Sequence, residues 1–301
     1  MGRDRVTWRG NICAVITPFA EDGALDRGLF VENLELLISE GIDGFVVAGD
    51  TGEFWALSDE ERFDLFKMAK ATARGRVPVI GNASAMTTGG AIAYARECKE
   101  IGLDGIMLLP PYYVRPGQRE IVAFFRAVSD AVDIPILLYN IPVRQGVNIP
   151  VDTVEQLADV PNIVAFKQST PEFMEAVETI RRVGHKMRIL TGHSVDRGLP
   201  CLVMGADGYL SSVEPQVMGK EAIDLYNLFT AGKIAEARAL QMKLIELDHA
   251  IHGGVGTFPA SLKAAMNLRG RPGGYPRLPL LYPTDEQMEK LRTILKKLNL
   301  L

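Results

Sequence analysis

Short apolar runs alternate with amphipathic segments along the first 230 residues of the chain. Eight of these runs have the length of a buried strand: Ile12–Thr17, Gly44–Gly49, Val77–Ala83, Gly105–Pro110, Pro135–Asn140, Ile163–Gln168, Arg188–Gly192 and Gly208–Val213. Between them the periodicity predicts helices that include Leu29–Glu40, Glu60–Ala73, Ala91–Glu100, Glu120–Ala131 and Phe173–Val183. Strands that alternate with helices indicate βαβ units and a parallel sheet.

A weak internal repeat supports this interpretation: Gly41-Ile42-Asp43-Gly44, Gly102-Leu103-Asp104-Gly105 and Gly205-Ala206-Asp207-Gly208. In each copy a glycine ends a helical pattern, and Asp-Gly then suits a tight turn into the next strand. The segment Ser58–Glu61 also has a capping-box pattern at a helix start. Eight such units fit a closed (β/α)8 barrel. An open doubly wound sheet is the alternative, but no GxGxxG follows the first run.

No strand pattern is evident from about Ala231 onward. The segments Ile234–Ile251, Ala260–Leu268 and Thr284–Leu298 are predicted helices, and a Gly/Pro-rich loop over Gly270–Pro283 precedes the last. We therefore expect a (β/α)8 catalytic barrel over residues 1–230 and a C-terminal helical subdomain over residues 231–301.

The charge balance argues against nucleic acid or anionic lipid as a partner, because a net charge of −4 and a pI near 5.7 provide no basic face. The three cysteines are far apart and form no CxxC motif, which suits a reducing compartment. Neither a signal-peptide core nor a membrane-length apolar stretch is evident. The expected location is the cytoplasm.

The sixth apolar run ends in Lys167, a costly residue to place beside a buried strand. One interpretation is that Lys167 only begins the next loop and points to water. The barrel offers another, because active sites of this fold lie at the C-terminal ends of strands. An ordinary lysine is neutral in roughly one molecule in a thousand near pH 7.4. A barrel mouth flanked by Phe166 and Tyr139 would desolvate the amine and allow a Schiff base with a 2-oxo acid.

Four short motifs occur in a specific order: Gly49-x-Thr51-Gly52-Glu53, Tyr112-Tyr113-x-Arg115-Pro116, Tyr139-Asn140-Ile141-Pro142-x-Arg144 and Phe166-Lys167. Together they resemble the dihydrodipicolinate synthase/N-acetylneuraminate lyase family of class I, pyruvate-dependent lyases. The similarity covers nearly the whole chain, including the Arg277–Leu280 loop and the last helix, and is greatest to the synthase branch.

The resemblance implies a role for each motif residue. Lys167 would form the imine with pyruvate, Tyr139 would be the general acid/base, and Tyr113 would complete a proton relay in the site of a neighbouring subunit. Further members of the implied site are Thr51 and nearby amides for the pyruvate carboxylate, Arg144 for the carboxylate of the second substrate, and Gly192 and Leu210 as pocket lining. The resemblance also implies a homotetramer built from tight dimers, with no metal and no cofactor. Tyr112 and Tyr113 have an alternative role as packing residues of their loop, and Glu53 is expected to be a structural hydrogen-bonding residue.

The chain departs from the synthase pattern at Asp50, where synthases usually carry the first of two threonines. A threonine hydroxyl can donate and accept, whereas an ionised aspartate only accepts, so Asp50 disfavours a relay of two tyrosines. The predicted activity is a synthase-like aldol condensation or cleavage. The alternatives are a 2-keto-3-deoxy sugar-acid aldolase or dehydratase, or an N-acetylneuraminate lyase-like enzyme. The apolar run Phe54-Trp55-Ala56 further predicts weak or no inhibition by lysine.

Three other classes of protein fit the sequence less well. A metal-dependent aldolase needs converging histidines and carboxylates, but the chain has four histidines, and His249-x-x-His252 lies in the C-terminal helices. A phosphate site at Gly253–Gly256 would lie outside the barrel repeats. A non-catalytic 2-oxo-acid sensor would not need to retain both Lys167 and Tyr139.

Overall fold

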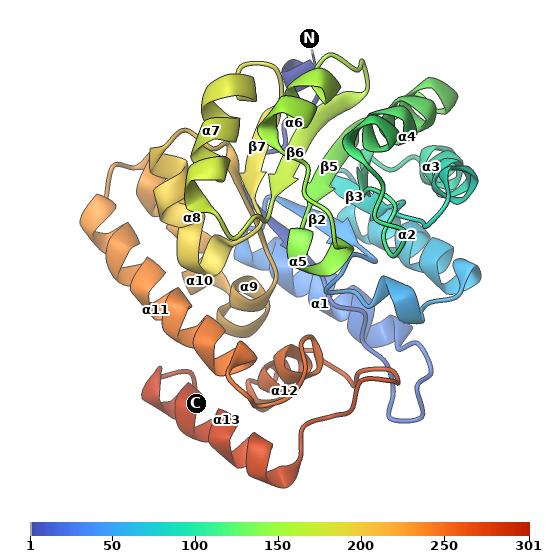
Figure 1. Ribbon diagram of the computed structural model, residues 1–301. Coiled ribbons are helices and arrows are strands. Elements are labelled where there is room, and N and C mark those ends of the chain that lie inside the picture. Colours follow the sequence, from blue (N-terminus) through green and yellow to red (C-terminus); the bar gives the residue numbers. More distant parts are fainter. Residues whose placement is uncertain (1) are drawn as a thin grey trace.

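Eight parallel strands close into a barrel in the computed structural model, which describes residues 2–301 (Figure 1). The strands follow the chain order around the barrel: β1 (Gly10–Ala14), β2 (Gly44–Val47), β3 (Val79–Asn82), β4 (Gly105–Leu108), β5 (Ile136–Asn140), β6 (Ile163–Gln168), β7 (Arg188–Thr191) and β8 (Gly208–Ser211). β1 pairs with both β2 and β8, which closes the sheet. The predicted (β/α)8 barrel is confirmed.

The helices of the outer ring are α1 (Arg27–Glu40), α2 (Asp59–Ala73), α3 (Thr88–Ile101), α4 (Gln118–Ala131), α6 (Val151–Leu157), α7 (Phe173–Val183), α8 (Ser194–Val203) and α10 (Lys220–Thr230). Short elements η1 (Gly2–Arg5), η2 (Phe54–Ala56), α5 (Pro142–Gln145) and α9 (Val213–Met218) lie between them. The capping box at Ser58 and Glu61 is confirmed. The sequence pattern did not reveal α8, because Gly198 and Pro200 interrupt it.

Several predicted strand limits were wrong by two or three residues. β1 begins earlier, at Gly10, because the polar Asn11 is buried in the sheet, where its backbone amide donates to Asp43 over 2.7 Å. β2 ends at Val47 because Ala48 has a positive φ of 51°. The predicted limits of β6 are confirmed.

The Gly-x-Asp-Gly repeat connects neighbouring strands. Gly41, Gly102 and Gly205 adopt left-handed conformations just beyond helix ends, as expected for C-caps. The aspartates Asp43, Asp104 and Asp207 accept hydrogen bonds from backbone amides of β1, β3 and β7, at 2.7, 2.9 and 2.9 Å. Each aspartate therefore attaches the start of one strand to the strand before it.

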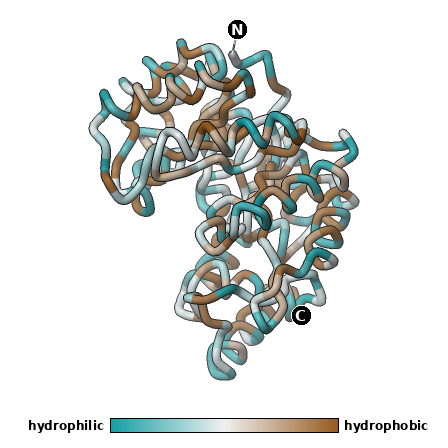
Figure 2. Tube along the Cα trace, turned by 90° about the vertical axis from the view of Figure 1, so that its right-hand side faces the viewer, coloured by the Kyte–Doolittle hydropathy of each residue, from teal (hydrophilic) through white to brown (hydrophobic). Residues whose placement is uncertain are grey.

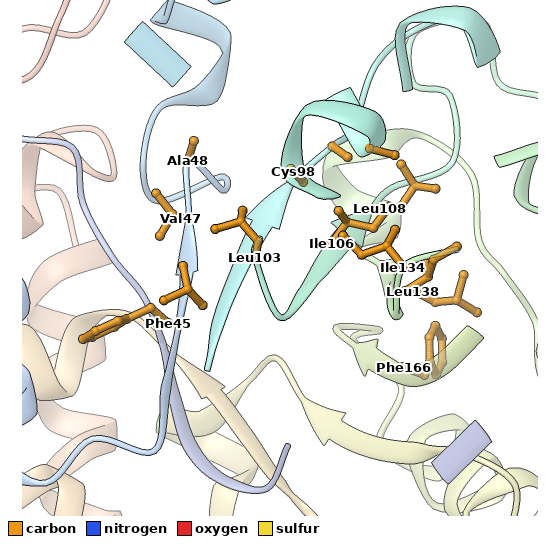
Figure 3. Packing of buried hydrophobic residues seen from close by; sticks show 14 of the residues in the cluster. Phe45, Val47, Ala48, Cys98, Leu103, Ile106, Leu108, Ile134, Leu138 and Phe166 are labelled. Atoms are coloured by element: carbon orange, nitrogen blue, oxygen red, sulfur yellow. The ribbon is translucent and has the colours of Figure 1, made fainter. Parts of the chain in front are cut away.

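The barrel has separate inner and outer apolar layers. Trp8, Met107, Tyr139 and Leu210 belong to the cluster that fills the barrel interior. Phe166 belongs instead to the cluster between the sheet and the outer helices, with Ile134 and Leu138 (Figure 3). The expectation that Phe166 flanks Lys167 was wrong, because adjacent residues of a strand point to opposite faces.

The C-terminal helices are α11 (Ile234–His252), α12 (Ala260–Leu268) and α13 (Asp285–Lys297). They continue from α10 along one side of the barrel and below it in Figure 1. Polar and apolar stretches alternate along the helices (Figure 2), and the buried faces of α8, α9 and α10 share one core with those of α11–α13. Within residues 2–301, no helix combines the length and the apolar character needed to cross a membrane.

Candidate active site

A cavity of about 320 Å³ opens at the C-terminal ends of the strands. Its wall contains seven of the eight predicted site residues: Asp50, Thr51, Tyr139, Arg144, Lys167, Gly192 and Leu210. They come from β5, β6 and β8 and from the loops after β2, β5 and β7. The barrel topology therefore brings together residues that are up to 160 positions apart in the chain.

Lys167 and Tyr139 are direct neighbours on β6 and β5, and both are buried. The Lys167 Nζ lies 3.9 Å from the centroid of the Tyr139 ring. Burial lowers the pKa of Lys167 to about 8, and the Asp50 carboxylate acts in the opposite direction. At that pKa roughly one amine in five is neutral near pH 7.4. The structure therefore contradicts the alternative in which Lys167 points to water.

Tyr139 has the opposite tendency. Burial, and then the charge of Asp50, raise the pKa of the phenol, while Ser169 and Arg144 act against this rise. Tyr139 therefore stays protonated at neutral pH and can donate to an oxygen that gains negative charge.

Gly192 leaves space that the lysine needs. A Cβ at this position would lie 2.9 Å from Lys167 Cε and 1.8 Å from Ser169 Oγ, so any side chain would displace both. The backbone amide of Gly192 donates to Gln168 O over 2.8 Å and holds the loop against β6. Leu210 is buried on β8 and forms an apolar part of the cavity wall.

Thr51 lies in a tight turn between Ala48 and Glu53, which both have positive φ values, of 51° and 54°. The amides of Gly52 and Phe54 donate to Gly49 O, and that of Glu53 donates to Asp50 O. These three amides are engaged within the turn and cannot also hold a carboxylate, so the expected anion nest is smaller than the motif suggested. The Thr51 hydroxyl and its own amide have no hydrogen-bond acceptor in the described part of the chain and are donors available to a ligand.

Asp50 and Arg144 form an ion pair across the cavity, with Arg144 Nε 3.2 Å from Asp50 Oδ2. Arg144 reaches this position because Pro142 begins the short helix α5. The loop is attached by Asn140, whose side chain exchanges hydrogen bonds of 2.8 Å with Gln168 and Gln145. The Tyr-Asn-x-Pro-x-Arg motif thus combines a reactive group, an anchor and a cation.

Tyr113 does not join the cavity within one chain. Its side chain is 88% exposed, and its φ is 74°. A bulky residue with that φ is strained, so its surroundings in the working protein must favour this conformation.

The motifs did not reveal one side of the cavity. Glu214 on α9, Asp248 and His252 on α11, and Phe258 after α11 all line it. His252 pairs with Asp248 over 2.9 Å, which raises its pKa, and its ring stacks on Phe258. No motif links α11 to the barrel strands, so only the fold shows this contact. In the described part of the chain, no three His, Cys, Asp or Glu side chains converge as a metal site would require.

Comparisons with known proteins agree with this geometry. The family model described as Dihydrodipicolinate synthetase family matches residues 7–298. A DapA-like lyase of Rhizobium meliloti is 37% identical over 99% of this chain and 98% of its own length. The 4-hydroxy-tetrahydrodipicolinate synthase of Trichlorobacter lovleyi is 35% identical over 98% of this chain and 100% of its own length. The crystal structure of dihydrodipicolinate synthase from Aquifex aeolicus is 36% identical in sequence and superimposes with a TM-score of 0.91. The match covers 97% of this chain and 99% of the Aquifex chain. The chain therefore belongs to the dihydrodipicolinate synthetase family of class I lyases, which act through a lysine Schiff base.

Proposed function

We propose that this enzyme joins pyruvate to an aldehyde, or cleaves the corresponding aldol, through an imine on Lys167. The observation that carries the proposal is a buried amine with a lowered pKa at the mouth of the barrel, beside a protonated tyrosine. The amine attacks the keto carbon of pyruvate, and water leaves to give the imine. Loss of a methyl proton then gives an enamine, whose carbon attacks the aldehyde. Hydrolysis releases the product and regenerates Lys167.

The other site residues support this sequence of steps. Tyr139 donates the proton that the departing water requires and takes a proton back in a later step. The hydroxyl and amide of Thr51 bind the pyruvate carboxylate, and Gly192 and Leu210 shape the pocket around the methyl group. Neither a metal ion nor a cofactor has a part in this scheme.

The first candidate for the second substrate is aspartate semialdehyde, the partner that the resemblance to the synthase branch implies. The second is a hydroxylated aldehyde derived from a sugar acid. The Asp50–Arg144 ion pair favours the second candidate, because the Asp50 carboxylate partly neutralises the guanidinium that a substrate carboxylate would otherwise bind.

We also propose a homotetramer made of tight dimers, located in the cytoplasm. Trp55, Tyr113 and Val114 are exposed apolar side chains, and Tyr113 would extend into a neighbouring site. Four further exposed apolar side chains lie on or beside the helices α7, α8 and α11 and suit contact between dimers: Met174, Val203, Met204 and Ile234. Three buried, unbridged cysteines suit a reducing compartment. Sedimentation tests the assembly, and a fully active monomer would contradict it. Such a monomer is a real alternative, because one structural relative is characterised as a monomeric dihydrodipicolinate synthase variant.

Borohydride trapping tests the chemistry. The protein is incubated with a panel of 2-oxo acids and reduced, and the adduct mass and its position are determined. We expect one reduced pyruvyl group on Lys167. A label on another lysine, or no label with any 2-oxo acid, would refute the proposal.

A further inference from the structure

The cavity extends away from Lys167 toward a second, polar region. This distal region is formed by the start of α8 (His193–Asp196), the β8–α9 connection (Ser211–Glu214) and the end of α11 (Asp248 and His252). The three helices lie on the same side of the barrel (Figure 1). Pyruvate bound at Lys167 would leave this region to the second substrate.

Glu214 is the least satisfied polar side chain in the distal region. It is 1% exposed, its Oε2 accepts a long hydrogen bond of 3.4 Å from the Ser212 amide, and the Ser194 side chain also lies close enough to lower its pKa. Its Oε1 has no hydrogen-bond partner in the described part of the chain. None of the ion pairs formed by residues 2–301 includes this carboxylate.

Gln216, two residues further along α9, provides a contrast. It is equally buried, but its Oε1 accepts from the Ile16 amide at 3.0 Å and from Asn33 at 3.1 Å, and its Nε2 donates to Ser212 O at 2.5 Å. The same short helix thus carries one polar side chain that is fully used by the fold and one that is not. A buried carboxyl oxygen without a partner costs stability, so the fold alone does not account for Glu214.

The surroundings of Glu214 disfavour its charge. Burial raises its pKa to about 7, the Ser194 side chain acts against this, and Asp248 on α11 raises the pKa further. Burial, and after it the charge of Glu214, raise the pKa of Tyr209 on β8 and of Cys13 on β1. At neutral pH the group is therefore partly protonated, and its free oxygen can donate a hydrogen bond as well as accept one.

We infer that Glu214 binds a hydroxyl group of the second substrate through Oε1, which makes the distal region a site for a hydroxylated aldehyde. A hydroxyl group donates and accepts, as a protonated carboxyl does. A substrate carboxylate beside Glu214 would meet a buried carboxyl group, because the positive charge of His252 is already paired with Asp248, and an ammonium would require an ionised Glu214. An alkyl chain would leave Oε1 unbonded, which disfavours it. This inference rests on the proposed imine at Lys167 and names the acceptor for that imine.

The test compares two aldehydes that differ only in their hydroxyl groups, glyceraldehyde and propionaldehyde, each with pyruvate. The measurement is the ratio of their kcat/KM values. We expect wild type to prefer glyceraldehyde by about 10-fold or more, Glu214→Leu to lose this preference, and Glu214→Gln to retain most of it, because an amide also donates and accepts. Glu60→Leu is the matched control, since Glu60 is also the second residue of its helix but is exposed.

Pyruvate trapping on Lys167 separates this inference from the proposed function. An equal ratio in wild type, an unchanged ratio in Glu214→Leu, or failure to condense either aldehyde while trapping persists would overturn the role of Glu214 and leave the imine intact. Loss of trapping in wild type would overturn both. If Glu214→Leu does not fold, the preference of wild type for glyceraldehyde should still change between pH 6 and pH 8 as Glu214 titrates, while that of Glu214→Gln should not. Identical ratios at the two pH values in wild type would refute the role of Glu214.

Discussion

Lys167 and Lys263 are both buried, yet they lie in opposite kinds of surroundings. Lys263, on α12, donates to Thr17 O at 2.6 Å and to Tyr275 O at 2.8 Å, and it pairs with the fully buried Glu53. Burial lowers its pKa to about 8, as it does for Lys167, and the Glu53 carboxylate acts in the opposite direction. Lys167 has no ion-pair or hydrogen-bond partner in the described chain, and its amine faces the cavity.

The comparison shows how one residue type serves two purposes. Lys263 joins the C-terminal helices to the start of the barrel, and Glu53 also accepts from the Arg277 amide at 3.1 Å, which confirms the structural role expected for Glu53. All three amine donors of Lys263 have acceptors, so its lone pair is unavailable. Burial lowers the pKa of both amines to about 8, so the pKa does not distinguish them, but only Lys167 lines the cavity without a hydrogen-bond partner in the described chain. Hydrogen bonding therefore distinguishes the reactive lysine better than burial does.

The largest expected effect is on turnover. Replacing Lys167 with Met should remove imine formation and lower kcat by about 10⁴-fold or more, because the nucleophile itself is lost. Lys263→Met should still trap pyruvate when assayed at a temperature where it is folded. Steady-state rates and borohydride labelling of both variants measure this difference, and equal losses in the two folded variants would remove the distinction.

The two substitutions should have opposite effects on stability. Lys263→Met leaves the Glu53 carboxylate buried and unpaired, and we expect the free energy of unfolding to fall by about 3–5 kcal/mol. Adding Glu53→Gln should recover part of this loss.

Lys167→Met removes a desolvation cost and should raise the free energy of unfolding by about 1–3 kcal/mol at neutral pH. This gain should disappear between pH 8 and pH 10.5, as the lysine of the unfolded wild type loses its proton. Denaturant unfolding of the single and double variants is the measurement.

The rate of pyruvate trapping should depend on pH through Lys167. Only the neutral amine attacks, so the rate should rise about tenfold per pH unit below pH 7 and level off above the pKa of about 8. Folded Lys263→Met should show the same profile. A plateau reached only near pH 10 would mean that the cavity does not lower the pKa of Lys167.

Steric space around the reactive lysine should matter as well. Gly192→Ala places a methyl group where Lys167 Cε and Ser169 Oγ lie, so we expect kcat/KM for pyruvate to fall about 10- to 100-fold. Gly89→Ala, on the exposed side of α3, meets no atom within 4 Å and should leave the rate unchanged. Trapping kinetics of both variants provide the comparison, and a Gly192→Ala enzyme with normal kinetics would show that the loop yields.

The sequence predicted the features that depend on local pattern. The strand order and Lys167 at the end of β6 follow from apolar periodicity and from the rule that barrel sites lie at strand ends. Three features depend on tertiary contacts and were not predictable in this way. Asp50 and Arg144 are 94 positions apart, and no spacing rule indicates their ion pair. That Phe166 points out of the barrel, away from Lys167, could be known only once the register of β6 in the sheet was fixed. Glu214 is in a segment without a motif, although a glutamate directly after the predicted apolar run Gly208–Val213 was a usable signal.

The smallest expected effect concerns Asp50, which lies near both Lys167 and Tyr139. Asp50 raises the pKa of each, so Asp50→Thr should move the trapping profile to lower pH and bring the phenol closer to its ordinary pKa. It should also release Arg144 from a half-exposed ion pair, which contributes about 1 kcal/mol or less to stability. A freed Arg144 and a threonine hydroxyl both suit aspartate semialdehyde, and we expect the rate with this substrate to rise a few-fold to tenfold while that with glyceraldehyde does not. Asp50→Asn separates the two causes, because it frees the arginine without supplying a hydroxyl. If wild type already condenses pyruvate with the semialdehyde at an ordinary enzymatic rate and Asp50→Thr is no faster, then Asp50 does not select the second substrate, and Arg144 binds a carboxylate despite the ion pair.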